Sequence, residues 1–260
     1  MPDPARPDAL AVVVVARDEE DRIGDCLASV SWADELVVVV DAATTDRTAE
    51  IAREHGASVV VRPWAGFVEQ KNFALERATC PWVLSLDADE RVSPRLAAEV
   101  REAIGAAPAD VAAADFPRRT FYLGRWIAHG GWYPDRKTRL VRRGRGRWTG
   151  SELHERLEAQ GRTIALGGDL LHHTYRDLSD HLRRIDRYTS ETARAWVAAG
   201  RRASIAAALV SPPLKFIKMY LLQAGFLDGA PGLFIAALGG YYVFLKHAKH
   251  WELTRVARRA

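Results

Sequence analysis

The sequence predicts an α/β protein in which a mostly parallel sheet carries helices on both faces, followed by a helical C-terminal extension. The first observation is that apolar runs typical of buried strands alternate with helical segments over about the first hundred residues. The second is the composition, because 48% hydrophobic and 27% charged residues in a chain of 260 are enough for a sizeable core. The third is that about the last fifty residues are rich in Leu, Phe, Tyr and Ala, with few charges.

Each element of the first part follows from its own pattern. Residues 10–16 read LAVVVVA, a continuous apolar run expected of a strand covered on both faces, and residues 35–41 repeat it. Between them, Ile23, Leu27 and Val30 recur at helical spacing, behind acidic residues that suit a helix N-terminus. The remaining elements are expected as strands at 57–63 and 81–87 and as helices at 44–56, 68–78 and 93–104.

Three of the expected helix ends carry recognisable caps. Thr45 or Asp46 can cap the second helix and Gly56 can end it, while Ser93 and Pro94 begin the fourth. Strands joined through helices in this order form parallel βαβ units, whose ligands bind outside the carboxyl ends of the strands. Since Asp41 and Asp87 each close an expected strand, both carboxylates should lie at one edge of the sheet.

The pattern loosens after about Asp110. Residues 123–150 are rich in Gly, Arg and Trp, which predicts irregular loops and short strands. A long helix resumes at Leu178. One face of this helix is expected to hold Leu182, Ile185, Tyr188 or Thr189, Thr192 and Trp196, and the opposite face Arg183, Arg184, Arg187 and Arg194.

The C-terminal segment has a membrane-like composition. Its longest uncharged run, residues 229–245, has 17 residues and includes Pro231, at the lower limit of the roughly 17–25 that a spanning helix needs. We therefore expect helices that lie in the membrane interface, with Lys246, His247, Lys249 and His250 towards the surface. A helical subdomain or oligomer contact is the alternative.

Charge and cysteine usage narrow the setting. The net charge is +4, and residues 135–147 hold seven Lys/Arg against one Asp, a segment suited to phosphorylated sugars, an anionic membrane or nucleic acid, or simply to a solvated loop. Cys26 and Cys80 lack metal-site and CxxC spacing, so buried free thiols in a reducing compartment are expected. The start of the chain shows no secretory signal, so the main domain is expected in the cytosol.

The stretch WVLSLDADERVSP (residues 82–94) places Asp87 and Asp89 two residues apart at a strand end. In extended geometry both point to one face, where like charges would repel unless a cation compensates them. Mg²⁺ or Mn²⁺ suits such a pair, because Mg²⁺ is commonly held by one or two carboxylates, waters and substrate phosphates. The stretch therefore predicts half of a metal–diphosphate site.

Together, VVVVARDEEDRIGDCLASV, VVVVDAATTDRTAEIA, FVEQKNFALERA and WVLSLDADERV resemble a family 2 glycosyltransferase of the GT-A fold. The later GWYPDRKTRLVRRG, WTGSELHERL and FIKMYLLQAGFLDG resemble its bacterial lipopolysaccharide-core β-glucosyltransferases. The resemblance implies an inverting, metal-dependent transfer of a hexose from a nucleotide-diphosphate sugar, UDP-glucose above all, to a lipopolysaccharide-core or lipid-linked saccharide. A polyprenyl phosphate is the alternative acceptor, and no nucleic-acid partner is expected.

The resemblance also implies a division of the chain. Residues 1–9 would form a disordered arm, and residues 10–177 the GT-A catalytic domain, with a nucleotide-sugar half at 10–110 and an acceptor half at 111–177. Residues 178–260 would form a helical, membrane-proximal extension. The protein would then be peripheral, on the cytoplasmic face of the inner membrane.

Site residues carried over from the family lie in its motifs. The resemblance implies that Asp41 contacts the base or ribose, in a pocket lined by Ala16, Arg17 and Glu19. It further implies that Asp87 faces the ribose, that Asp89 holds the metal, with Asp87 beside it, and that Lys71 lies near the donor. The chain departs from the family at Ala42-Ala43, where Ser-Gly is usual, and at Asp18, where Asn is usual.

An inverting transfer needs a base for the attacking hydroxyl. The Glu-Asp and Gln-x-x-Arg-Trp motifs of many relatives are missing, so Glu155 is the candidate base, with His154 orienting it or donating to phosphate. Asp135 is the reserve, and simple ion pairing of Glu155 with arginines is the alternative. Arg136, Arg139 and Arg142 would suit a phosphorylated acceptor. His172 or His173 either completes the metal or diphosphate site or is a core histidine, and Trp132, Tyr133 and Trp148 either stack on sugars or fill the core.

Other functional classes fit the sequence less well. A sugar-phosphate nucleotidyltransferase would need a glycine-rich loop after the first strand, and a dinucleotide-binding oxidoreductase would need GxGxxG there, whereas VVVVARDEED has no glycine. A non-catalytic basic binding module would explain the arginines and the C-terminal segment, but it leaves Asp41, Asp87 and Asp89 without a role.

Overall fold

The computed structural model describes residues 6–150 and 155–256, which divide into two compact units. The first comprises the described residues up to Arg118 together with those from Asp135 to His172. The second comprises Arg119–Pro134 and the described residues from His173 onward. Each unit is described by itself below.

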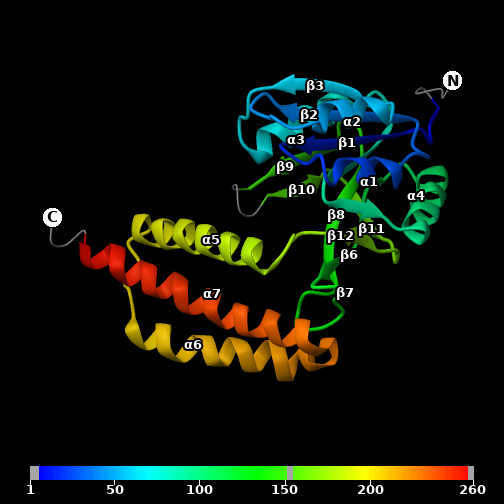
Figure 1. Ribbon diagram of the computed structural model, residues 1–260. Coiled ribbons are helices and arrows are strands. Elements are labelled where there is room, and N and C mark those ends of the chain that lie inside the picture. The colour runs from blue at the N-terminus through cyan, green and yellow to red at the C-terminus, as the bar shows by residue number, and fades with distance from the viewer. Residues whose placement is uncertain (1–5, 151–154, 257–260) are drawn as a thin grey trace. The chain divides into compact units, whose positions relative to one another are not determined.

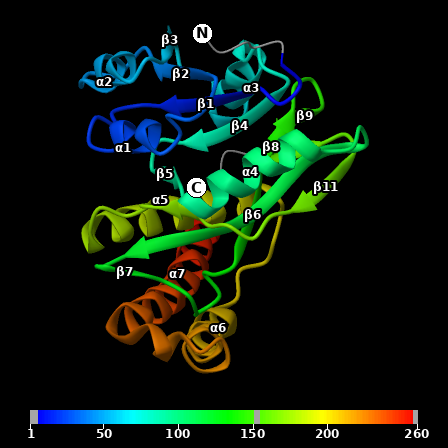
Figure 2. The same cartoon turned by 90° about the vertical axis from the view of Figure 1, so that its right-hand side faces the viewer.

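The first unit is built on a mixed sheet whose first half is parallel, as predicted (Figures 1 and 2). Strands β1, β2, β3 and β4 lie in the order β3-β2-β1-β4 and all pair in parallel. Strand β8 runs antiparallel to both β4 and β6. The strands of this sheet are β1 (Leu10–Ala16), β2 (Glu35–Asp41), β3 (Ser58–Arg62), β4 (Trp82–Asp87), β5 (Glu90–Val92), β6 (Val111–Tyr122), β8 (Asp135–Arg142), β11 (Arg162–Ala165) and β12 (Leu170–His172). A separate hairpin joins β9 (Gly146–Thr149) to β10 (Arg156–Ala159).

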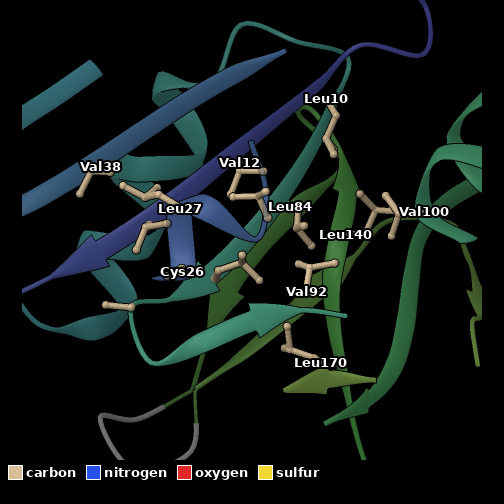
Figure 3. Close-up of a cluster of buried hydrophobic side chains, with 14 of the residues drawn as sticks. Leu10, Val12, Cys26, Leu27, Val38, Leu84, Val92, Val100, Leu140 and Leu170 are labelled. Atoms are coloured by element: carbon tan, nitrogen blue, oxygen red, sulfur yellow. The ribbon is translucent and has the colours of Figure 1, made fainter. Parts of the chain in front are cut away.

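Helices cover both faces of this sheet. Alternate residues of β1 therefore pack into two different hydrophobic cores, one on each face. Leu10, Val12 and Val14 pack with helices α1 (Ile23–Ala28), α2 (Thr48–Glu54) and α4 (Pro94–Ala106), in the cluster that Figure 3 shows. The intervening residues Ala11, Val13 and Val15 pack with α3 (Phe67–Arg77) and with the β9–β10 hairpin. Cys26 and Cys80 are buried free thiols, as expected.

Local signals explain where the helices start. Ser93 Oγ accepts from the N–H of Leu96 at 3.2 Å, and Pro94 fills the first turn of α4. Asp46 Oδ1 accepts from the N–H of Thr48 at 2.9 Å, although α2 itself begins two residues later, at Thr48.

The expectation that Asp89 continues an extended strand is wrong. Strand β4 ends at Asp87, and Ala88 and Asp89 form a turn that leads into β5. The physical reason is local, since the Glu90 carboxylate accepts from the N–H of Asp87 at 3.0 Å and folds the chain back. Asp87 and Asp89 therefore occupy different positions around the turn.

The second unit is mainly helical. It holds α5 (Leu178–Ala198), α6 (Ile205–Ile217), which continues into a π-helical turn η1 (Lys218–Leu222), the 3-10 turn η2 (Gly225–Asp228), and α7 (Gly229–Val256). The strand β7 (Arg125–Trp126) pairs with Phe121 and Tyr122. Helix α7 packs against both α5 and α6 (Figure 1).

The predicted buried face of α5 differs from the observed one, and Pro231 is compatible with a continuous α7. The buried residues of α5 are His181, Ile185, Thr189 and Ala193, so its inner face is rotated relative to the prediction, and Leu182 is 40% exposed. Pro231 does not interrupt α7 because it lies in the first turn. At Gly239 a Cβ atom would meet Met219 Sδ at 2.5 Å, so the glycine leaves room for the Met219 side chain of η1 against α7.

Candidate active site

The carboxyl ends of the parallel strands bring the predicted donor-side residues to one edge. Ala16 ends β1, Asp41 ends β2 and Asp87 ends β4. The register pairs Val15 with Asp87 and Ala16 with Val40, so these ends are adjacent. The sequence argument for a shared edge is therefore correct.

Asp41 anchors the turn that follows β2. Its buried carboxylate accepts from the N–H of Ala43 at 3.0 Å and lies 3.2 Å from the Arg17 guanidinium. Among the described residues, the non-glycine residues with positive φ are Asp18, Leu123 and Ala224. Ala42 and Ala43 thus need no left-handed conformation, and the missing Ser-Gly pair causes no backbone conflict.

Arg17 and Glu19 belong to an ordered loop beside this turn. Asp18 Oδ1 accepts from the N–H of Thr45 at 2.9 Å, and the N–H of Glu19 donates to Thr48 Oγ1 at 2.8 Å. The side chain of Arg17 is more than half exposed and faces Asp41. The four residues expected to line a base or ribose pocket are therefore neighbours.

Asp87 is held between two buried cations. Lys71 Nζ lies 2.7 Å from Oδ1, and Arg139 Nη2 lies 2.6 Å from Oδ2. Burial raises the pKa of the Asp87 carboxyl, but Arg139 and then Lys71 outweigh it, so the pKa is lowered well below its usual range. Lys71 is only 2% exposed. A buried ammonium group needs a nearby negative charge, and the Asp87 carboxylate provides one.

Glu90 is a site residue that the sequence analysis missed. It is 0% exposed and accepts from Arg139 at 3.0 Å and from Arg118 at 3.3 Å. Burial lowers the pKa of Arg139, yet Asp87 and Glu90 more than offset this, so the pKa of the guanidinium is raised. The available signal was the third carboxylate of LDADE, a charge in a stretch that returns to the core.

The ion pairs continue to Asp135. Arg118 Nη2 lies 2.8 Å from Asp135 Oδ2, and Lys137 Nζ lies 3.0 Å from Asp135 Oδ1. Burial raises the pKa of Asp135, but Arg118 and Lys137 lower it further than burial raises it. The reserve candidate for the base is therefore the charge partner of two cations.

Glu155 joins the other end of the same chain of charges. Lys71 Nζ donates to Glu155 Oε1 at 3.1 Å, so one lysine bridges the candidate base and Asp87. The two partners are 84 positions apart in sequence. His154, expected to orient Glu155, lies outside the described residues.

Trp148 is a wall for the two cations. The Lys71 ammonium lies 4.4 Å from its ring centroid and the Arg139 guanidinium 4.9 Å. The Asn72 side chain fixes the main chain of Trp148, donating to its C=O at 2.9 Å and accepting from its N–H at 2.8 Å. Trp148 is buried, so its ring packs on the site's own cations.

Asp89 lies at a separate corner with His172. Asp89 Oδ2 is 3.4 Å from His172 Nε2 and 3.6 Å from Arg22 Nη1. Burial raises the pKa of Asp89, but His172 and Arg22 lower it, and the balance is downward. The other ring nitrogen of His172, Nδ1, is buried without a hydrogen-bond partner.

The donor atoms of this corner fit a divalent cation that keeps other ligands. Mn²⁺ can bind both a carboxylate and an imidazole. Mg²⁺ prefers a carboxylate together with water and phosphate oxygens. Within residues 6–150 and 155–256, no group of three or more His, Cys, Asp or Glu side chains is placed to hold a metal. A cation here would therefore need oxygen ligands from a substrate, as a diphosphate provides.

A cavity of about 550 Å³ opens beside the ion pairs. Its lining is mainly polar and consists of Asp87, Arg118, Arg136, Lys137, Thr138, Arg139, Trp148, Glu155, Arg156 and Leu157. Arg136 donates to Asp115 Oδ1 and to the main-chain oxygens of Asp115 and Leu166. Its guanidinium lines the cavity but is already engaged.

The other histidines and arginines considered as site residues make contacts within the fold. Arg142 donates to the main-chain oxygens of Val111 and Ala107, so it supports the fold and not an anion site. Within the basic segment 135–147, Arg139 is buried and Arg142 is engaged by main-chain oxygens. In the second unit, His173 packs against both Phe121 and Trp126, and His129 Nδ1 lies 3.3 Å from Asp228 Oδ1.

Comparisons with known proteins identify the family of this chain. The model of the family described as glycosyl transferase family 2 matches residues 11–156. The lipopolysaccharide core biosynthesis glycosyltransferase LpsC of Rhizobium meliloti (strain 1021) is 30% identical, over 94% of this chain and 92% of its own. An uncharacterized glycosyltransferase of Rickettsia typhi (strain ATCC VR-144 / Wilmington) is 26% identical, over 96% and 89%.

A solved structure shares the fold. The mannosyltransferase PcManGT from Pyrobaculum calidifontis superposes with a TM-score of 0.55 at 16% identity, covering 96% of this chain and 89% of its own. Its sequence is too distant to transfer more than the GT-A architecture. The family match over more than half of the residues and the near full-length match to LpsC show that this chain belongs to glycosyl transferase family 2 and is a glycosyltransferase.

Proposed function

We propose that this protein transfers a hexose, with inversion, from UDP-glucose to a lipopolysaccharide-core or lipid-linked saccharide. The single observation that carries the proposal is the bridge by Lys71 between Glu155 and Asp87 at the edge where three parallel strands end. The printed name of LpsC, which this chain covers over 92% of its length, supports the acceptor class. The mannosyltransferase of matching fold was solved with GDP-Man and Mn²⁺, which is consistent with a nucleotide-sugar donor.

Each side of the site has its own part in donor binding. Asp41, with Ala16, Arg17 and Glu19, would receive the base or ribose, and Asp87 would face the ribose. Asp89 and His172 would hold Mg²⁺ or Mn²⁺, which when bound neutralises the charge that develops on the leaving diphosphate. Arg139 is oriented by Asp87 and Glu90, so its guanidinium has a fixed position at the cavity and its charge is balanced by these carboxylates.

Glu155 would act as the base. The acceptor hydroxyl oxygen attacks the anomeric carbon, the bond from that carbon to the diphosphate oxygen breaks, and the hydroxyl proton passes to the Glu155 carboxylate. The nucleotide diphosphate leaves with the bonding electrons. Lys71 Nζ donates to Glu155 Oε1 at 3.1 Å. This hydrogen bond holds the Glu155 carboxylate in one position at the cavity.

A polyprenyl phosphate is a second candidate acceptor. The observation that favours it is the apolar, exposed outer face of α6, which would keep the enzyme near a lipid. We further propose a peripheral location on the cytoplasmic face of the inner membrane, where both acceptor classes would be within reach.

The test combines a donor panel with two matched variants. UDP-glucose, UDP-galactose and GDP-mannose are offered with Mn²⁺, Mg²⁺ or a chelator, and donor turnover is scored for the wild type and Asp89→Ala. Metal-independent turnover that survives in Asp89→Ala would contradict the corner as drawn. Glu155→Gln should lower kcat by about 10²–10⁴-fold with an unchanged donor Kd.

Glu158→Gln is the control, because Glu158 lies on β10 of the same hairpin but pairs with Arg156 at the surface. It should leave kcat within about twofold of the wild type, as expected of a surface change away from the reacting atoms. Near-normal transfer by Glu155→Gln would remove that residue from the role of base.

A further inference from the structure

The outer face of α6 is apolar along its whole length. Leu209 is 65% exposed and Leu214 58% exposed. Ile205, Val210 and Ile217, together with Leu221 in the η1 turn that continues this helix, are likewise exposed large hydrophobic residues, and the outer face of α6 is taken to include Leu221. Successive members are one, three or four residues apart, which places them on one half of the helix surface. α6 and η1 pack on α7, and their buried residues are Ala208 and Met219, respectively. A water-soluble helix shows the reverse pattern.

The second unit also has the charge that an anionic surface attracts. Residues 173–256 hold 12 Lys/Arg against 6 Asp/Glu, a surplus of 12 − 6 = +6, whereas the whole chain carries +4. Lys218 is exposed at the start of η1, which continues α6, and Arg201 and Arg202 precede the first turn of α6. Amphipathic helices of this kind bind membranes through apolar area together with attraction to anionic lipids.

Aromatic rings and cations also meet in this unit. The Arg201 guanidinium lies 4.6 Å from the Trp196 ring centroid, and the Arg255 guanidinium lies 5.2 Å from that of Trp251. Lys246 lies over both Trp196 and Tyr242. Trp and Tyr with Lys and Arg are typical of the membrane–water interface.

Two segments of this unit are long and apolar enough to cross a bilayer by length and composition, Ile205–Leu222 with a mean hydropathy of 1.4 and Gly225–Arg255 with 1.2. Their polar contacts oppose crossing. Lys249 on α7 donates to Asp186 Oδ1 at 2.7 Å, to Ser190 Oγ at 2.7 Å and to Thr189 Oγ1 at 3.0 Å, which ties α7 to the arginine-rich α5. Burying these groups in hydrocarbon would be costly.

The turn between α6 and α7 is tied as well. The buried Asp228 accepts from the N–H of His129 at 2.8 Å and from the N–H of Ala128 at 3.2 Å. A hairpin that crossed the bilayer would have to carry this end or the Lys249 end into it, or break their hydrogen bonds. An orientation parallel to the membrane leaves both intact.

We propose that α6 lies in the plane of an anionic lipid bilayer, with its outer face, defined by Ile205, Leu209, Val210, Leu214, Ile217 and Leu221, inserted among the headgroups and upper acyl chains. The occupant of this face is thus lipid and not a second copy of the chain. This contact involves only the second unit, so its test uses no sugar donor and its outcome is separate from that of the transfer reaction.

The test measures depth along the helix. Cysteines introduced singly at Leu209, Leu214 and Leu221 are spin-labelled in the full chain and bound to vesicles of phosphatidylcholine with phosphatidylglycerol. Cys26 and Cys80 are buried and can stay. We expect all labels at the same shallow depth, about 5–10 Å, and a label at Leu182 on α5 in water. A depth that changes steadily by about 18 Å from Leu209 to Leu221 would overturn the proposal in favour of a spanning helix.

Binding variants give the second readout. Leu209→Gln with Leu214→Gln changes only exposed side chains, and it should lower the vesicle partition coefficient by about tenfold or more. Leu182→Gln, equally a loss of an exposed leucine, should not change it. Added salt should weaken binding. Equal losses in both variants, salt-insensitive binding, or α6 labels that become protected at rising protein concentration without vesicles would each overturn the proposal.

Discussion

Replacing Glu90 by glutamine is the sharpest probe of the buried ion pairs. In the structure, one carboxylate oxygen faces two guanidinium groups, from Arg118 and Arg139, and the other faces the N–H of Asp87. Every neighbour is a donor. A glutamine keeps the shape but must turn its NH₂ towards one of these donors, whichever way the amide is flipped. It also leaves two buried guanidinium groups with one carboxylate fewer.

The expected cost follows from these two losses. A buried donor without an acceptor costs about 1–3 kcal/mol, and removing one partner of a buried ion pair costs about 3–5 kcal/mol. Because the two overlap at one residue, we expect Glu90→Gln to lower the free energy of unfolding by about 3 kcal/mol. That corresponds to a melting temperature lower by about 6–12 °C for a protein of this size class.

Scanning calorimetry at pH 7 measures this shift, with Glu102→Gln on the exposed surface of α4 as the matched control, expected within about 0.5 kcal/mol. A second substitution that removes one of the two cations should recover part of the lost stability. In an Arg118→Met background one excess cation is gone, so Glu90→Gln should cost at least about 1 kcal/mol less there. If Glu90→Gln melts with the wild type, or if its cost is the same in both backgrounds, the charge-balance reasoning is refuted.

The remaining predictions concern the hydrogen bonds between Asn72 and the main chain of Trp148, and the buried His181. Asn72→Ala removes both hydrogen bonds to the main chain of Trp148, so we expect a loss of about 1–3 kcal/mol in chemical denaturation and a lower kcat, with a smaller effect on the donor Kd. In α5, burial and then Arg184 lower the pKa of His181 to about 4, against an opposing effect of Asp180, and the Tyr122 hydroxyl lies 2.8 Å from its Nδ1. Because the unfolded histidine titrates near 6.5, stability should be full above that pH and fall by at most about 3 kcal/mol as the pH drops to about 4, a slope that His181→Asn should remove.

The strands of the parallel half could be predicted almost to the residue, because buried parallel strands are uninterrupted apolar runs. The expected strands at 10–16 and 35–41 are β1 and β2. Strand β6 was not foreseen, since its second half reads PRRTFY and looks like a loop. Arg118 is tolerated within that strand because Glu90 and Asp135, from distant parts of the chain, receive its guanidinium. Such pairing is non-local and leaves no periodic signal.

The site divides in the same way. Strand order alone was enough to place Asp41 and Asp87 together, because parallel strand ends share an edge. Only the resemblance to known glycosyltransferases suggested Lys71 and Glu155, and nothing in their spacing brings residues 84 apart together. The face of α5 was misjudged because His181 and Ala193 are buried while Leu182 is not, a choice made by its packing partners and not by hydropathy.

The charge count of the buried ion pairs bears on how a sugar nucleotide could be held. Lys71, Arg139, Arg118 and Lys137 alternate with Glu155, Asp87, Glu90 and Asp135, each cation within 3.3 Å of a carboxylate. These eight groups cancel, which makes their burial tolerable but leaves no surplus positive charge for a diphosphate. An anionic donor would therefore be repelled as much as attracted by this wall. The charge must come from elsewhere, and the Asp89–His172 corner, whose donor atoms suit a divalent cation, is the candidate place for it. On this reasoning, a chelator should weaken binding of the nucleotide diphosphate far more than binding of the nucleoside alone.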